Sequence, residues 1–313
     1  MASKQVTKMP SAWPRGRMGL EQWTRRALAL ALLPLLALAG LDAAGAGTLD
    51  RITETGVIRA GTRMDAIPFA FDDGHGKPIG FSVDLLEEIR AAAEKSLGKP
   101  IKLDLSVVTP ANRVQRVADG TLDIVCEITT PTWDRERQVD FSIPIFRDGT
   151  RILAFRDTVR QVPNPKDMLI GVAEGTTTAT ILADALPGIR IKNYPSMDDA
   201  FVALGKGEVQ GVANIGVVLL GLSRKFEPTR SVVLLPRSAP FGNETMSCIV
   251  PQDDSSWRDF VNHTIIDLED GLTDYRGRYM DIHDKWFGRD GVMVYPLDRS
   301  TRDYLLQSDI WAR

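Results

Sequence analysis

The sequence predicts an α/β fold with a mainly parallel sheet, because short apolar stretches alternate with amphipathic ones in two successive runs. The order strand, helix, strand, helix, strand extends from residue 57 to residue 126, and it returns from residue 169 to residue 215. A chain of 313 residues is long enough for one or two domains with a sizeable core. We therefore expect the second half of the chain to repeat the element order of the first.

The first run is predicted from short apolar strands and from helical spacing of apolar residues. Its strands and helices are expected, in order, at residues 57–60, 82–97, 103–107, 112–118 and 124–126. Within the longer helix, Leu85, Leu86 and Ile89 fall on one face. Ser82 is expected to cap this helix, and Asp84 lies where the helix dipole favours an anion.

The second run repeats the alternation and is followed by helices. Its elements are expected at residues 169–172, from 178 to about 186, 189–194, 196–205 and 211–215. Ser196 is the expected cap of the second of these helices. Towards the C-terminus, helical spacing predicts a helix over residues 254–270 that Gly271 ends, and another over residues 272–287. The last 25 residues have weak periodicity and are expected to wrap the surface.

Residues 1–46 have the pattern of a signal peptide. Four arginines between residues 15 and 26 form a basic segment, residues 27–41 are apolar, and residues 44–46 are small enough for a cleavage site. The alternative is a retained membrane anchor. The apolar run is short for a membrane span and contains Pro34, which favours cleavage. We therefore expect a chain exported to the periplasm.

The net charge of the exported part argues against some partners. Cleavage after residue 46 removes six basic and two acidic residues, which changes the formal charge from −3 to −7. An acidic product is a poor binder of nucleic acid or of anionic membranes. We therefore expect no nucleic-acid partner.

Two cysteines remain after cleavage. Cys126 and Cys248 both follow or lie within apolar stretches of strand type. An even pair in an oxidising compartment can form a disulfide, and two separately buried thiols are the alternative. We expect the disulfide.

Polar side chains that suit an anion follow four of the predicted strands. They are Arg63, then Thr109 and Arg113, then Thr130 and Arg135, and finally Thr176 and Thr177. In open α/β sheets, ligands bind outside the carboxyl ends of the strands, where all four places lie. Arginine offers a planar pair of donors to a carboxylate, and hydroxyls and free N–H groups can fill its remaining lone pairs.

The ordinary role of each arginine taken alone would be a solvated surface charge. Their shared position at strand ends instead favours a common site. Three arginines are more than a neutral ligand requires, and they suit an anion with more than one acidic group. We therefore expect a small anionic ligand.

Patterns that would indicate catalysis or a cofactor are weak. The histidines at positions 75, 263 and 283 lack metal-ligand spacing with another histidine, cysteine or acid. No lysine follows Gly175 as in a P-loop, and no G-x-S-x-G sequence is present. We therefore expect no catalytic residue, no metal and no cofactor.

The chain resembles the family-3 periplasmic solute-binding proteins of polar amino-acid ABC importers over about residues 49–287. The resemblance is carried by GVIRAGTRMDAIPFAF, GKPIGFSVDLLEEI, TLDIVCEITTPTWDRERQVDFS and LIGVAEGTTTA. It is strongest for the glutamate/aspartate-binding branch, which has an arginine at the place of Arg63, ANR or QNR near Arg113, and a cysteine near Cys126.

The resemblance implies a two-lobe, type II periplasmic-binding-protein fold with the ligand cleft between the lobes. Residues 47–150 with 247–288 would form the first lobe, residues 151–246 the second, and residues 289–313 a tail. Two strands would cross between the lobes near residues 151–156 and 240–249.

The resemblance also implies roles for individual residues. Thr130 and Arg135 would bind an α-carboxylate, and Thr176 and Thr177 would approach it from the second lobe. Arg63 and Arg113 would bind the side-chain carboxylate of an acidic ligand, with Thr109 nearby.

Two departures from the family pattern concern the ligand's amino group. The family usually places an aspartate near residues 211–215 to accept an ammonium, whereas this chain has Asn214 and Ile215. Glu127 and Ile128 are also unusual at their positions. Either Glu127 accepts the ammonium, or the ligand has no α-amino group.

These observations together predict an exported receptor, not an enzyme, that captures a small anionic metabolite. An acidic amino acid is the leading ligand, and the receptor is expected to be a monomer that delivers it to an inner-membrane ABC permease. The alternatives are a binder of a non-amino organic acid, an enzyme similar to cyclohexadienyl dehydratase with Glu127 as general acid, and a receptor that feeds a different membrane partner.

Overall fold

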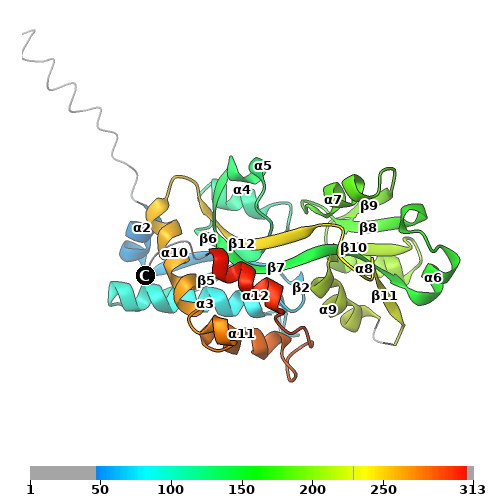
Figure 1. Ribbon diagram of the computed structural model, residues 1–313. Helices are drawn as coiled ribbons and strands as arrows, with labels where there is room; N and C mark the ends of the chain where they lie inside the picture. The colour runs from blue at the N-terminus through cyan, green and yellow to red at the C-terminus, as the bar shows by residue number, and fades with distance from the viewer. Residues whose placement is uncertain (1–46, 228, 309–313) are drawn as a thin grey trace, which may run out of the picture. The chain divides into compact units, whose positions relative to one another are not determined.

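The computed structural model describes residues 47–227 and 229–308 of the chain (Figure 1). The signal peptide expected at residues 1–46 and the end of the predicted tail, residues 309–313, lie outside the described residues. The described part is a mixed α/β protein with two lobes around one continuous sheet, so the predicted α/β class is confirmed.

The first lobe contains a parallel group of strands covered by helices. Its strands are β1 (Val57–Thr62), β5 (Lys102–Val107) and β6 (Ile124–Thr129), and β1 pairs in parallel with both others. Its helices are α2 (Thr48–Thr55), α3 (Phe81–Leu97), α4 (Arg113–Ala118), α5 (Trp133–Glu136), α10 (Ser255–Leu268) and α11 (Arg278–Phe287). A small separate sheet is formed by β2 (Asp65–Ala66), β3 (Ala70–Asp72) and β4 (Pro78–Ile79).

The second lobe repeats this arrangement. Its strands are β8 (Leu169–Ala173), β9 (Arg190–Tyr194), β10 (Gly211–Ile215) and β11 (Val232–Leu235). Its helices are α6 (Arg156–Gln161), the 3-10 helix η1 (Pro165–Asp167), α7 (Thr178–Ala185), α8 (Met197–Gly205) and α9 (Gly216–Phe226). Ser196 caps α8 as predicted, because its Oγ accepts the N–H of Asp199 at 3.1 Å.

Two long antiparallel strands connect the lobes. They are β7 (Val139–Phe155) and β12 (Asn243–Pro251), and Figure 1 shows them passing side by side between the two halves. Residues 139–149 of β7 pair with β12, whereas residues 150–155 pair with β10 and β11. The complete order of the sheet is β5-β1-β6-β12-β7-β10-β8-β9, with β11 also on β7.

Two local predictions were wrong. The helix α3 begins one residue earlier with Gly80 as its N-cap, so Ser82 lies inside the first turn and its buried Oγ has no hydrogen-bond partner among the described residues. A single helix over 272–287 is replaced by the 3-10 helix η2 (Leu272–Asp274) and α11, since Tyr275 and Gly277 between them have positive φ. The segment with weak periodicity contains α12 (Arg299–Ser308), which packs against β7.

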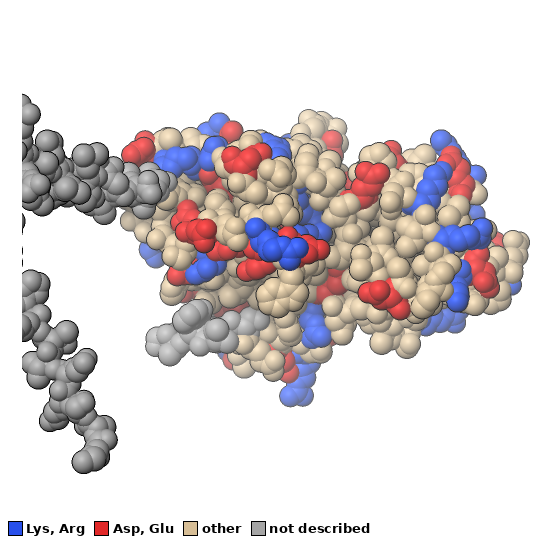
Figure 2. Space-filling model, turned by 90° about the horizontal axis from the view of Figure 1, so that it is seen from above, with Lys and Arg blue, Asp and Glu red and all other residues tan. Residues whose placement is uncertain are grey.

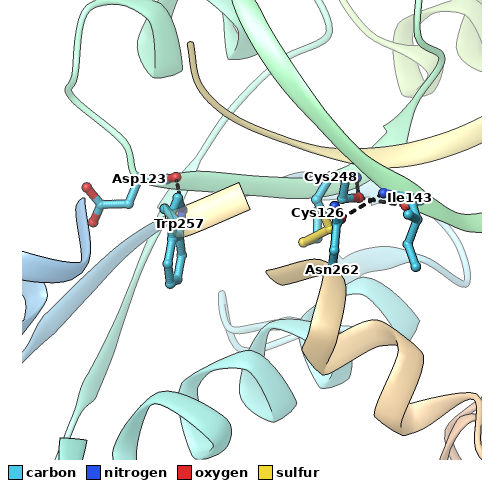
Figure 3. Close-up of a disulfide and its surroundings, with 7 residues drawn as sticks. Asp123, Cys126, Ile143, Cys248, Trp257 and Asn262 are labelled. Carbon is cyan, nitrogen blue, oxygen red and sulfur yellow. Dashed lines mark hydrogen bonds between the residues drawn. A yellow bond between two sulfur atoms is a disulfide. The ribbon is translucent and has the colours of Figure 1, made fainter. Parts of the chain in front are cut away.

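A disulfide joins the two strands that lie at the centre of the first lobe. Cys126 on β6 and Cys248 on β12 are direct partners in the antiparallel register, and their sulfur atoms are bonded. Figure 3 shows the helix α10 beneath them, where Trp257 Nε1 donates to the Asp123 carbonyl at 2.8 Å and Asn262 accepts the N–H of Ile143 at 2.9 Å. The disulfide fixes β6 to β12, and the two hydrogen bonds fix α10 to the residue before β6 and to β7.

The surface of the described part carries both signs of charge. Figure 2 shows lysine and arginine interspersed with aspartate and glutamate over the face in view. Among the described helices, none is both long and apolar enough to cross a membrane.

Candidate functional site

A small cavity with a volume of about 20 Å³ lies between the two lobes. It is enclosed by Arg63, Arg113, Ile128, Thr130, Thr176, Thr177, Thr178, Asn214, Ile215 and Glu244. The first lobe contributes residues that follow β1 and β6 and begin α4, and the second lobe contributes the ends of β8 and β10. Six residues predicted for a ligand site therefore lie on the wall of one cavity. They are Arg63, Arg113, Thr130, Thr176, Thr177 and Asn214.

Arg63 is a fully buried cation with donors left over. Its Nε donates to Asp65 Oδ1 at 2.8 Å, and its two terminal nitrogens have no hydrogen-bond partner among the described residues. Burial lowers the pKa of Arg63, but the adjacent Asp65 outweighs this and holds the pKa above its usual range. The side chain is therefore charged and has two donor groups without acceptors.

Arg113 is buried without a counter-ion. It is 1% exposed, and its Nε and Nη1 have no hydrogen-bond partner among the described residues. Burial lowers its pKa well below the usual range, and the positive charges of Arg135 and Arg63 lower it further. Because a buried charge without a partner is costly, this arrangement favours the arrival of an anion.

Glu244 is the charged residue of the cavity wall that sequence reasoning missed. It is 4% exposed, its Oε2 accepts the hydroxyls of Thr130 (2.8 Å) and Thr177, and its Oε1 accepts the hydroxyl of Thr150. The carboxylate thus connects β6, β7, β12 and the start of α7. Thr176 was also expected to contact the ligand, but its hydroxyl donates to the Ala173 carbonyl at 2.8 Å.

Three of the predicted residues do not line the cavity. Thr109 is exposed, and its N–H donates to Asn112 Oδ1 at 2.9 Å. Arg135 donates to the carbonyls of Thr130 (2.6 Å) and Gly175 (2.9 Å), so these donors are used by the backbone. Glu127, expected as an ammonium acceptor, is fully buried and does not line the cavity.

The contacts of Arg135 join the lobes beside the cavity. Thr130 follows the first-lobe strand β6, whereas Gly175 follows β8 in the second lobe. Gly175 has φ 71°, and a Cβ there would lie 2.6 Å from the Ala111 Cα. Only glycine therefore fits this close approach. Asp65 adds a further link, because its Oδ2 accepts the N–H of Met197 at 3.1 Å.

Glu127 is a buried carboxyl next to the cation of Arg63. Its Oε1 accepts the N–H of Arg63 at 3.0 Å and the Thr62 hydroxyl at 3.2 Å, while Oε2 has no partner among the described residues. Burial raises the pKa of Glu127 from its ordinary 4.5 to about 7, against the opposing charge of Arg63. The group therefore changes charge close to neutral pH.

Replacement of Glu127 by glutamine is expected to flatten the dependence of stability on pH. Between pH 4.5 and about 7 the folded protein keeps a proton that the unfolded chain releases, so the free energy of unfolding falls as pH rises through this window. The shift corresponds to roughly 3 kcal/mol, lost in full above pH 7. Urea denaturation of both proteins at pH 5, 6, 7 and 8 measures this, and parallel profiles would contradict it.

The described residues contain no group of three or more histidine, cysteine or acidic side chains that could hold a metal ion. The cavity wall presents the guanidinium groups of two arginines, threonine hydroxyls and one carboxylate. Such a wall suits a small ligand that carries carboxylate groups.

Comparisons with known proteins agree with this geometry. The L-glutamate/L-aspartate-binding protein of Pseudomonas aeruginosa is 32% identical over 249 residues, which cover 77% of this chain and 80% of that protein. The glutamate/aspartate import solute-binding protein of Escherichia coli K12 is 31% identical over 267 residues, 83% of this chain and 86% of that protein. A solved solute receptor for L-cysteine from Neisseria gonorrhoeae matches with a TM-score of 0.64 and 25% identity, over 76% of this chain and 92% of that one.

The sequence also matches a family model over residues 58–289, which is most of the chain. The model describes bacterial extracellular solute-binding proteins of family 3. The two-lobe fold and the cavity between the lobes fit this description. The chain therefore belongs to the bacterial extracellular solute-binding proteins, family 3.

Proposed function

We propose that this protein is an exported, monomeric receptor that binds an acidic amino acid, glutamate or aspartate, in the cavity between its lobes. It then delivers the ligand to an ABC permease in the inner membrane. The observation that carries the proposal is the pair of buried arginines, Arg63 and Arg113, whose nitrogens lack acceptors on the cavity wall.

The charge of the cavity wall supports a small dicarboxylate amino acid. Each arginine can form a two-donor contact with a carboxylate, and the hydroxyls of Thr130 and Thr177 lie on the same wall. A basic amino acid would bring a side-chain cation to a wall that already holds two arginines, and this repulsion opposes its binding. A neutral ligand would leave buried donors unsatisfied.

The relatives support the same ligand class and the role in transport. The two named above are described as binding or importing glutamate and aspartate. Their extracellular family agrees with the signal peptide expected at residues 1–46. We also retain the lobe bounds expected from sequence, namely residues 47–150 with 247–288 and residues 151–246.

An enzyme of the cyclohexadienyl dehydratase type has less support. Its expected general acid, Glu127, does not line the cavity, and its Oε1 is occupied by Thr62 and Arg63. Incubation with prephenate or arogenate is therefore expected to yield no product.

A thermal-shift screen of refolded, ligand-stripped protein tests the proposal. L-glutamate and L-aspartate at about 100 times Kd should each stabilise the folded state by roughly 2.7 kcal/mol, seen as a rise of several degrees in Tm. L-arginine and L-lysine serve as charge-reversed controls and should cause no shift. Stabilisation by basic amino acids, or by neither acidic one, would contradict the proposal.

A further inference from the structure

We infer that Glu244 accepts the ammonium group of the ligand and thereby selects amino acids over dicarboxylates that lack nitrogen. This inference rests on the proposed function and deepens it. At the end of β10 the cavity wall has the uncharged residues Asn214 and Ile215, so another residue must supply an anion if the ligand has an α-amino group.

Glu244 is well placed to be that anion. Among the described residues that line the cavity, it is the one acidic side chain. It reaches the cavity from β12, with both carboxylate oxygens held by threonine hydroxyls. A carboxylate has about four lone-pair positions, so three hydroxyl donors leave room for a further donor.

The other acidic and amide groups near the cavity are less suitable. Asn214 lines the wall, but its Oδ1 accepts the N–H of Ile215 at 2.8 Å and an amide carries no charge. Asp65 is already paired with Arg63 and with the N–H of Met197. Glu127 lies behind the wall, with one oxygen occupied by Thr62 and Arg63.

The hydroxyls around Glu244 allow it to exchange one partner for another. In the structure, Thr130 and Thr177 donate to Oε2. A hydroxyl can rotate to donate elsewhere, and it also accepts hydrogen bonds. When an ammonium reaches Oε2, the two hydroxyls become available to the ligand's α-carboxylate. The same two threonines then donate to the ligand's carboxylate, while Glu244 accepts a hydrogen bond from its ammonium.

This arrangement discriminates by repulsion as well as by attraction. L-glutamate places its cation against Glu244 and its two carboxylates against the arginines and hydroxyls. Glutarate has the same two carboxylates but no ammonium, so Glu244 would remain a buried anion beside a second anion. Truncation of one partner of a buried charge pair costs about 2–5 kcal/mol, so the expected preference is on the order of 100-fold or more.

Calorimetric titration of L-glutamate and glutarate tests the inference in the wild type, in Glu244→Gln and in a control, Glu208→Gln, whose exposed carboxylate pairs with Lys192 away from the cavity. The wild type and the control should prefer L-glutamate by about 100-fold. In Glu244→Gln, the affinity for L-glutamate should fall by a similar factor, while glutarate binds as well as before or better. Comparable losses for both ligands, or an unchanged ratio, would show a purely structural role and overturn the inference.

The wild type alone keeps the inference testable if Glu244→Gln does not fold. Equal wild-type affinity for L-glutamate and glutarate would overturn the ammonium contact while leaving an anion receptor intact. Absence of wild-type binding to both ligands would instead remove the proposed function itself, and this inference with it. Circular dichroism and a melting curve establish whether each variant is folded.

Discussion

Replacement of Arg113 by methionine is expected to abolish high-affinity ligand binding while making the ligand-free protein more stable. The guanidinium is buried without a counter-ion, and burial together with Arg135 and Arg63 lowers its pKa well below the usual range. Removing an unpaired buried charge should raise the free energy of unfolding by about 1–3 kcal/mol. Losing its bond to a ligand carboxylate should weaken L-glutamate binding by a factor on the order of 10² to 10³.

Calorimetric titration and urea denaturation measure these two effects separately. Arg116→Met is the matched control, since Arg116 lies on the same helix, α4, and donates to the Val107 carbonyl away from the cavity. This control should leave affinity unchanged. A stability loss in Arg113→Met without loss of affinity would mean that Arg113 is held by the fold and does not meet the ligand.

Replacement of Arg63 by methionine should also weaken binding, but with the opposite effect on stability. Asp65 would lose the guanidinium that now holds its pKa below the usual range against the effect of burial. Removal of one partner of a buried pair costs about 3–5 kcal/mol. L-glutamate binding should fall by a factor on the order of 10² or more, and binding of the monocarboxylate L-glutamine should fall far less.

The double variant Arg63→Met/Asp65→Asn separates the two consequences. With both charges removed, urea denaturation should show that most of the stability returns, while calorimetry still shows weak binding of L-glutamate. If L-glutamate and L-glutamine lose affinity equally, Arg63 takes no part in recognition of the second carboxylate.

The opposite stability effects follow from one difference between two similar side chains. Both arginines are fully buried, but of the two only Arg63 has an acidic neighbour within hydrogen-bond distance among the described residues. The sequence shows two arginines after apolar strands and does not show which of them has a partner. That distinction depends on the turn after β1, which brings Asp65 back to Arg63.

The elements themselves were largely predictable because their strands are buried and their helices amphipathic. The strand over residues 211–215 was predicted with the bounds that the structure has, since a fully buried strand has a mainly apolar sequence. The break at Tyr275 and Gly277 was not predictable, because the apolar spacing continues on both sides of it.

The cavity was found in part because a simple rule applies to parallel strands. Their carboxyl ends lie at one edge, so Arg63, Thr130 and Thr177 could be placed together from sequence. Glu244 escaped this rule because β12 is antiparallel to its neighbours, and its residues at the cavity lie near its amino end. Arg135 was expected to bind a carboxylate because it follows a strand, but its sequence position does not show that its guanidinium donates to backbone carbonyls.

The disulfide between β6 and β12 has a consequence for how long a ligand stays bound. It joins β6 to β12 close to Thr130 and Glu244, so these two side chains stay together when the lobes move apart. Opening breaks two bonds that cross to the loop before α7, Thr177 to Glu244 and Arg135 to the Gly175 carbonyl, which are charge-assisted and are worth about 1.5–3 kcal/mol each. These bonds favour the closed state without a ligand, and a ligand lengthens its residence time by adding its own bonds to both lobes. A membrane partner that displaces the second lobe alone would be sufficient to shorten it.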